Sequence, residues 1–359
     1  MDQTRGWFYT LTVLSTALHN RPAFKNCICT GLLMAEGGQK LSKRLKNYPD
    51  PNEVLGSIGS DALRWFLVSS PVLKGGNLAV DKEGKEIAKA SRVAQIPLWN
   101  AFYFFTLYAN AEEYKAKEIT SSSEAIDNYI LSKLKRLRDT VKSGIESYDV
   151  AVATNEIAAF MEVLNNWYIR RTRDRFWEGD ALAFDTLYTV LVNVAKIIAP
   201  LMPFVSEYVF KTLTGEESVH LADYPSLSEI AYDAALVEQM DFVQDLCSTA
   251  KFIREEKNLP LASLTVIGAE LSPAYQDIVK DELNVKEVKF DNNLDNYAAK
   301  KVYLYTPLLG KTLGKEMGAV MGAYKQGKWE LNADGTLNIA GQNLGKDLFE
   351  VRLEMKDGV

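Results

Sequence analysis

One stretch of the chain, residues 81–213, constrains the fold more than any other, because its apolar residues recur with the period of an α-helix. Glycine and proline are sparse there, apart from Pro200 and Pro203, which should interrupt the last helix. Short polar or glycine-containing breaks separate helical segments at 81–110, 124–147, 149–178 and 181–213. Helices joined by short loops predict a helix bundle.

The residues before this stretch mix helical and strand patterns. Residues 7–19 have the spacing of a buried helix, and residues 24–34 read as a strand that ends at Gly31 and an apolar stretch that follows it. Residues 52–69 again have a helical apolar face, with Asn52 as a candidate cap. Helix, strand, loop and helix in this order are typical of the second half of a Rossmann-type α/β nucleotide-binding domain.

The residues after 225 change character once more. Residues 226–257 predict a long amphipathic helix, which helices at 273–283 and 308–325 follow. Short strands are predicted between and after these helices, at 264–267, 285–290, 301–305, 329–331, 337–339 and 348–353. The sequence therefore predicts a multidomain, mainly α protein. Its predicted parts are a half nucleotide-binding domain at 1–80, a helix bundle at 81–225 and a small C-terminal α+β domain at 226–359.

Composition limits the classes of function. The 359 residues have a net charge of −6, so any contact with nucleic acid must use local basic patches. The sequence has no run of about 18 apolar residues, so it predicts no membrane-spanning helix. Three cysteines without framework spacing fit a reduced, cytoplasmic location, and with only two histidines they predict no metal site.

A cationic loop stands between the helix–strand segment and the second helix. Lys40, Lys43, Arg44 and Lys46 lie within seven residues, after two glycines and before a Pro-Asp-Pro breaker. A short cationic loop of this kind suits a polyphosphate. Taken alone, however, it is more typical of a solvated surface loop, because basic runs of this length are common.

Ordered motifs decide between these two interpretations. Together they resemble the isoleucine-specific branch of the class I aminoacyl-tRNA synthetases, which implies an ATP-closing loop and an anticodon-binding bundle. The motifs are DQTRGWF at 2–8, KLSKR at 40–44, NYPDP at 47–51, DALR at 61–64, NNWYIRR at 165–171 and SVHLADYP at 218–225. The family's first signature, a histidine-rich turn, and its editing domain are not found in this sequence.

The resemblance implies a set of site residues. Lys40 and Lys43 are the implied catalytic residues, and Trp7 would wall the amino-acid pocket. The implied ATP- or adenylate-binding residues are Asp2, Gln3, Gly31, Ser42 and Lys43. Without the resemblance, the first residues would read as a turn with a helix-capping Asp and a core Trp, Gly31 as a turn glycine, and Ser42 as a residue that shapes the loop.

A second candidate site carries arginines interleaved with aromatic residues. This spacing suits tRNA, because guanidinium groups pair with phosphates and stack on bases. It suits equally well a helix whose arginines pair with nearby acids and fix one helix to another. The arginines are Arg170, Arg171, Arg173 and Arg175.

The implied activity is ATP-dependent formation of isoleucyl-adenylate and transfer of isoleucine to tRNA(Ile). ATP with Mg²⁺ enters as substrate, and neither a tightly bound cofactor nor zinc is expected. The motifs begin inside the catalytic domain, so the expected partners are isoleucine, ATP, tRNA(Ile) and an N-terminal part of the same chain. The segment alone should be inactive but should bind tRNA. The alternatives are a valyl or leucyl relative, or a non-catalytic tRNA-binding module.

Overall fold

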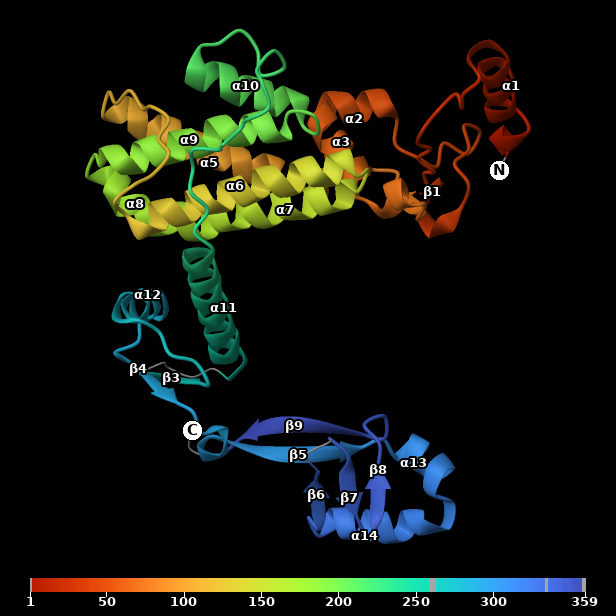
Figure 1. Cartoon of the computed structure of the whole chain (residues 1–359), viewed down its shortest axis with the longest axis vertical. Coiled ribbons are helices and arrows are strands. Elements are labelled where there is room, and N and C mark those ends of the chain that lie inside the picture. Colours follow the sequence, from red (N-terminus) through yellow and green to blue (C-terminus); the bar gives the residue numbers. More distant parts are fainter. Residues whose placement is uncertain (1, 258–262, 333–334, 357–359) are drawn as a thin grey trace. The chain divides into compact units, whose positions relative to one another are not determined.

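The computed structural model describes residues 2–257, 263–332 and 335–356 and separates into two compact units. The first unit is Met1–Phe242 and the second is Val243–Val359. Helices dominate the first unit, whereas the second combines short strands with helices (Figure 1).

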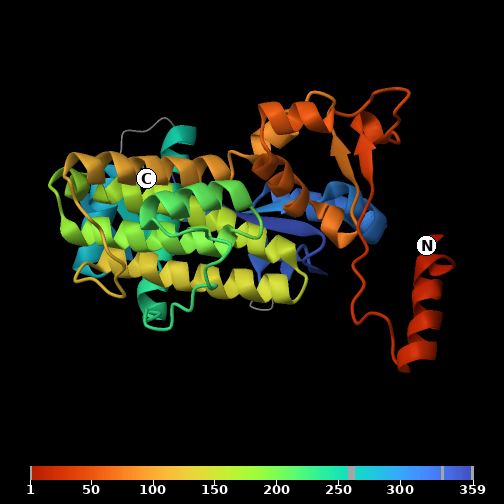
Figure 2. The same ribbon diagram turned by 90° about the horizontal axis from the view of Figure 1, so that it is seen from above.

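The predicted helix bundle is confirmed. Figure 1 and Figure 2 show its long helices α5, α6, α7 and α9 side by side. Two of the four expected segments are divided, the first into α4 and α5 and the last into α9 and α10. The third is continuous, as expected, but contains a π-helical turn. The elements are α4 Lys85–Ala90, α5 Gln95–Ala111, α6 Ala125–Glu146, α7 Val150–Val163, the π-helix η4 Leu164–Ile169, α8 Arg170–Trp177, α9 Ala181–Ile198 and α10 Pro203–Thr214.

Polar caps and prolines set these helix ends. Asp149 and Asp180 cap α7 and α9, since their carboxylates accept the N–H groups of Val152 and Leu182. The predicted interruption near Pro200 and Pro203 is confirmed: α9 ends at Ile198 and α10 starts at Pro203, where a proline costs no helical hydrogen bond.

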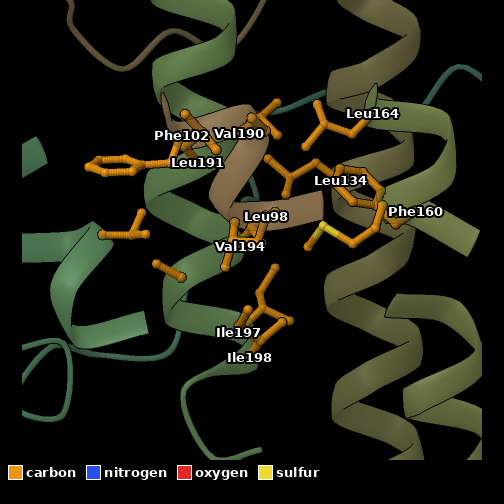
Figure 3. Packing of buried hydrophobic residues seen from close by; sticks show 14 of the residues in the cluster. Leu98, Phe102, Leu134, Phe160, Leu164, Val190, Leu191, Val194, Ile197 and Ile198 are labelled. Atoms are coloured by element: carbon orange, nitrogen blue, oxygen red, sulfur yellow. The ribbon is translucent and has the colours of Figure 1, made fainter. Parts of the chain in front are cut away.

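Helix α9 is the centre of the bundle core. Its apolar side chains Val190, Leu191, Val194, Ile197 and Ile198 are fully buried against residues from α5, α6 and α7 (Figure 3). Among the described residues, α9 is the one helix long and apolar enough to cross a membrane. With 78% of that window buried in the bundle, its composition is what a core helix requires.

The segment before the bundle contains a short parallel sheet. Strands β1 (Leu33–Ala35) and β2 (Leu78–Val80) pair in parallel, with helices α2 (Pro51–Ser57) and α3 (Ser60–Val68) in the connection between them. The remaining elements here are 3₁₀ turns at η1 Asp2–Thr4, η2 Glu36–Gly38 and η3 Pro71–Lys74. A strand–helix–strand connection of this kind agrees with the expected α/β character.

Two predictions for this segment were wrong in detail. The helix expected at 52–69 is divided at Gly59, whose φ of 101° lies outside the helical region, and the cap is Asp50 rather than Asn52. The strand expected to end at Gly31 is absent, since residues 24–32 belong to no strand and β1 begins at Leu33. Strand propensity alone does not make a strand, because a strand needs a neighbour for its backbone groups.

The predicted helix at 7–19 is confirmed as α1 (Trp7–His19), but it is not buried. None of its residues is buried, and Trp7, Tyr9 and Leu18 are 62%, 64% and 73% exposed. Its ring contact is with the segment that follows it, where Phe8 lies 5.2 Å from Phe24. Apolar periodicity predicts that a helix has a face to cover, but not what covers it.

The C-terminal unit combines helices with small sheets, of which its described residues form three. Its hydrophobic core contains the buried side chains of Val302, Leu309, Val320, Leu337 and Phe349. Strands β3 and β4 pair in parallel. The pairings are antiparallel between β5 and β9 and within the sheet β6–β7–β8. The elements are α11 Ala234–Lys257, which begins in the first unit, then β3 Ser263–Ile267, α12 Pro273–Leu283, β4 Glu287–Asp291, η5 Leu294–Asn296, β5 Ala298–Leu304, α13 Thr306–Leu313, η6 Gly314–Glu316, α14 Met317–Lys325, β6 Trp329–Leu331, β7 Leu337–Ile339, β8 Gln342–Leu344 and β9 Phe349–Met355.

Most elements of this unit were expected, with three differences. The helix expected at 308–325 is divided into α13 and α14 at Gly314, whose φ of 51° lies outside the helical region. Helix α11 begins eight residues later than residue 226, since 226–233 form turns. Strand β8 was missed because Gln342–Leu344 is short and follows a tight turn in which Ala340 and Gly341 both have positive φ.

Candidate functional site

The basic loop follows strand β1 through a tight turn. Gly37 and Gly38 have φ values of 74° and 75°, which residues with a side chain rarely adopt. The turn brings Lys40 back beside Met34 in an antiparallel bridge, and the N–H of Ala35 donates to the carbonyl of Gln39 at 2.8 Å. The loop therefore begins at a fixed point at the end of β1.

Asn47 closes the loop on itself. Its Nδ2 donates to the carbonyl oxygen of Lys40 at 3.1 Å, and its Oδ1 accepts the N–H of Ser42 at 2.8 Å. The Ser42 Oγ in turn accepts the N–H of Leu45 at 3.3 Å. Ser42 therefore shapes the loop, while its own O–H remains a donor that a phosphate oxygen can use.

The loop presents its positive charges to solvent. Lys40, Lys43, Arg44 and Lys46 are all exposed. Within the part of the chain that the structure describes, none of the four forms an ion pair with an acid. A hydrogen-bonded loop that carries four such cations concentrates positive charge at one place on the surface, which attracts anions.

Gly31 is required by the chain itself. Its N–H donates to the carbonyl of Val72 at 2.7 Å, and a Cβ at this position would lie 1.8 Å from the carbonyl oxygen of Gly76. The next residue continues this contact, because the N–H of Leu32 donates to Oδ1 of Asn77 at 3.1 Å. The structure thus shows a close approach of residues 75–77 to Gly31, and contact with an adenine ring stays a prediction.

We expect Gly31→Ala to destabilise the β1–β2 segment by about 1–3 kcal/mol, because the methyl group overlaps the Gly76 carbonyl. The measurement is hydrogen exchange of the amides in β1 and β2. Gly56→Ala is the matched control, since Gly56 lies inside α2 with open space around its Cβ position. That control should be neutral or stabilising by up to about 1 kcal/mol; equal protection in both variants would contradict the expectation.

Gln3 and Trp7 lie at the start of α1. Gln3 Oε1 accepts the N–H of Trp7 at 3.3 Å, so Gln3 binds one of the free donors at this helix end. Trp7 is exposed and is therefore not the core residue of the alternative interpretation. Among the described residues, no hydrogen bond or ring contact joins Gln3 or Trp7 to the basic loop. The side chain of Asp2 lies outside the described residues.

Arg175 lies inside the bundle, where it binds two acids. Its Nη1 and Nη2 donate to Oδ1 and Oδ2 of Asp127 at 2.8 and 3.0 Å, and its Nε donates to Asp180 at 2.7 Å. Burial opposes the charge of Arg175, but the hydrogen bonds to both acids outweigh it and raise its pKa. Arg175 therefore fixes α8 to α6 and α9, which is the second of the two expected roles.

Of the other three arginines, Arg171 is half-buried and two are exposed. Arg170 and Arg173 are exposed, and Arg170 Nε donates to the carbonyl of Asn166 at 2.8 Å. The guanidinium of Arg171 lies 5.3 Å from the ring centre of Trp167. At the end of the same helix Trp177 is 76% exposed. Helix α8 thus combines cations and an aromatic ring on its outer face, as contacts to nucleic acid require.

Comparisons with known proteins show the family of the chain. Residues 1–79 match the family model described as tRNA synthetases class I (I, L, M and V), and residues 127–268 match the anticodon-binding domain of tRNA ligase. Over 98% of its length, the chain is 43% identical to the isoleucine–tRNA ligase of Rickettsia bellii and 45% identical to that of Leifsonia xyli subsp. xyli. The chain belongs to the class I tRNA synthetases. It spans 35% and 32% of the lengths of those two relatives.

Among solved structures, a leucyl class I synthetase from Agrobacterium radiobacter K84, in a complex with tRNA, matches 79% of this chain. The sequence identity is 16% and the TM-score 0.49, which is too low to define a shared arrangement.

Three residues that join helices to one another through hydrogen bonds were not predicted from the sequence: Asp61, Arg64 and Asp127. One feature of the sequence could have indicated Asp127: it is an acid that interrupts the apolar face of its helix beside Ile126 and Ile130.

Proposed function

We propose that this chain is a segment of an isoleucine–tRNA ligase. In this proposal it supplies the loop that closes over the phosphates of ATP and the bundle that receives the anticodon part of tRNA(Ile). The observation that carries the proposal is the basic loop: Lys40 and Lys43 follow β1 of a parallel strand–helix–strand unit, are exposed and have no acidic partner among the described residues. The 43–45% identity to isoleucine–tRNA ligases supports isoleucine as the amino acid.

The chemistry follows from charge. The carboxylate of isoleucine attacks the α-phosphorus of ATP, the bond to the bridging oxygen breaks, and negative charge develops on the leaving pyrophosphate. Ammonium groups of Lys40 and Lys43, placed on a loop that closes late, stabilise this charge more than that of bound ATP. Mg²⁺ enters as the partner of the ATP phosphates, and the described residues contain no cluster of three metal-binding side chains.

The test is isoleucine-dependent exchange of pyrophosphate into ATP by the full-length protein that contains this segment. Exchange with isoleucine should exceed exchange with valine by about 150-fold, a ratio already established for isoleucine-specific synthetases, whose pocket distinguishes the two by one methylene. Exchange with valine or leucine alone would assign the segment to one of the sister enzymes, and absence of exchange with any amino acid would refute the proposal.

A tRNA-binding module without catalysis is the second candidate, favoured by the outer face of α8. We expect the 359-residue chain to bind tRNA with an affinity that falls as salt rises. Arg173→Ala should reduce the salt slope by about 1 if Arg173 contacts a phosphate. Lys142→Ala, an exposed cation on α6, is the control and should leave the slope unchanged. A salt-independent affinity would mean that phosphates are not the main contact.

A further inference from the structure

Helix α3 belongs to two cores at once. Its Ala62 and Phe66 are buried in a small core with Val54 of α2 and Val80 of β2, next to the basic loop. Its Trp65 is 1% exposed and is buried in the core of the bundle. Figure 1 shows α2 and α3 at the end of the bundle helices. The same helix thus touches the loop segment on one face and the bundle on the other.

Asp61 of this helix binds the start of α10. Its Oδ2 accepts the N–H of Val205 at 2.7 Å and its Oδ1 accepts the N–H of Phe204 at 3.3 Å. Asp61 is only 3% exposed. A helix N-terminus has free N–H groups and a positive dipole end, so a buried carboxylate there is held by charge as well as by hydrogen bonds.

Arg64, one turn further along α3, binds the end of α9. Its Nη2 donates to the carbonyl of Pro200 at 2.9 Å and its Nε to the carbonyl of Leu201 at 3.3 Å. Pro203 starts the next helix, and these carbonyls lie where a helix end leaves acceptors without partners. Asp61 and Arg64 therefore bind the positive and the negative helix ends of one turn, α9–α10; we name this pair the α3 clamp.

A second contact between the loop segment and the bundle reinforces the clamp. Lys74 Nζ lies 2.8 Å from Oδ1 of Asp149, the residue that caps α7. The hydrogen bond from Lys74 holds the pKa of Asp149 below its usual range. Both side chains are substantially exposed, so the orienting contact is the buried clamp rather than this surface pair.

We propose that Asp61 and Arg64 are positioning residues that fix the orientation of the bundle on the catalytic segment, so that tRNA held by the bundle reaches the aminoacyl-adenylate. This inference rests on the proposed function. Neither residue touches ATP or the amino acid in this assignment, since both bind backbone groups of the bundle. Formation of the adenylate needs no tRNA, whereas transfer to tRNA does. The clamp should therefore affect the two steps differently.

The experiment compares the two steps in the full-length protein. Asp61→Ala and Arg64→Gln should lower tRNA charging at least about tenfold while pyrophosphate exchange stays within about twofold of the unsubstituted enzyme. Asp61→Asn should recover most of the charging, because asparagine caps a helix nearly as well as aspartate. Asp50→Ala is the matched control: it removes a carboxylate cap from α2 of the same segment, without a bundle partner among the described contacts. Equal losses in both reactions, or none, would overturn the proposal.

Hydrogen exchange in the 359-residue chain separates failure of the clamp from failure of the proposed function. Asp61→Ala should expose the amides of α2 and α3 to exchange independently of α9, whereas Asp50→Ala should leave α3 exchanging with the bundle. The clamp is refuted if α3 and α9 still exchange together in Asp61→Ala. If the unsubstituted full-length protein shows no pyrophosphate exchange, the proposed function fails. The inference that rests on it then fails as well, even if the hydrogen-exchange result for Asp61→Ala is as expected.

Discussion

Replacing Asp127 with asparagine is expected to lower the free energy of unfolding of the helix bundle by about 3 kcal/mol. Four donors converge on this buried carboxylate: two from Arg175, the Oη of Tyr168 at 3.0 Å and the Oγ of Ser122 at 2.8 Å. An amide has one oxygen and one NH₂ group, so one side of the substituted side chain would present a donor to donors. The loss combines unpaired buried groups with a guanidinium that keeps only one of its two acidic partners.

The burial of the partners sets the size of this effect. Asp127 is fully buried and the side chain of Arg175 is 20% exposed. Burial and the Asp127 charge raise the pKa of Tyr168 well above its usual range, so its hydroxyl remains a donor at neutral pH. Asp180 still binds Arg175 after the substitution, which places the expected loss at the lower end of the range for broken buried pairs.

Hydrogen exchange of the α6 and α8 amides measures the loss in the bundle without interference from the C-terminal unit. Glu156→Gln is the matched control, because Glu156 pairs with Arg136 between α6 and α7 but the arginine is 44% exposed. That control should cost at most about 1 kcal/mol. A loss in Asp127→Asn no greater than in Glu156→Gln would show that the buried network adds no stability.

Periodicity predicted the bundle well because each helix has a partner within the chain. Apolar spacing and the prolines at 200 and 203 located α6, α9 and α10 closely. Prediction from periodicity failed where strand formation or burial depended on a neighbouring element. Residues 24–31 have strand propensity but no strand beside them, and α1 has an apolar face that no described element covers. Local sequence specifies a conformation, whereas burial requires a second surface.

The candidate site residues also divide into those that the local sequence indicates and those whose role depends on neighbours in space. The lysines of the basic loop stand out in the local sequence as a cluster of cations, and the ordered motifs around them led to the interpretation as an ATP-closing loop. The roles of Arg175 and Gly31 were not separable, because both depend on what approaches them in space: two acids in one case and the Gly76 carbonyl in the other. The α3 clamp lay within a recognised motif, DALR, but its partners are about 140 residues away in the chain.

Lys43→Gln in the full-length protein is expected to reduce the rate of isoleucyl-adenylate formation by about 10²- to 10³-fold, as removal of one preorganised transition-state donor does. ATP affinity should fall far less, because the loop closes on charge that grows as pyrophosphate leaves. The structure supports this division: Lys43 is exposed on a loop whose shape is held by Asn47 and Ser42 rather than by Lys43 itself. Its removal should leave the loop conformation intact.

Lys46→Gln is the matched control for this substitution. It removes the same charge from the same loop, and the positive φ of Lys46 burdens lysine and glutamine alike. Single-turnover kinetics with varied ATP separate binding from chemistry. A transition-state contact at Lys43 lowers the maximal rate and leaves half-saturation nearly unchanged, whereas the control should lower neither by more than a few fold. Equal losses in rate and affinity at Lys43 would mean that it binds ATP uniformly, and equal effects at Lys43 and Lys46 would mean that the loop acts through net charge rather than through one placed ammonium group.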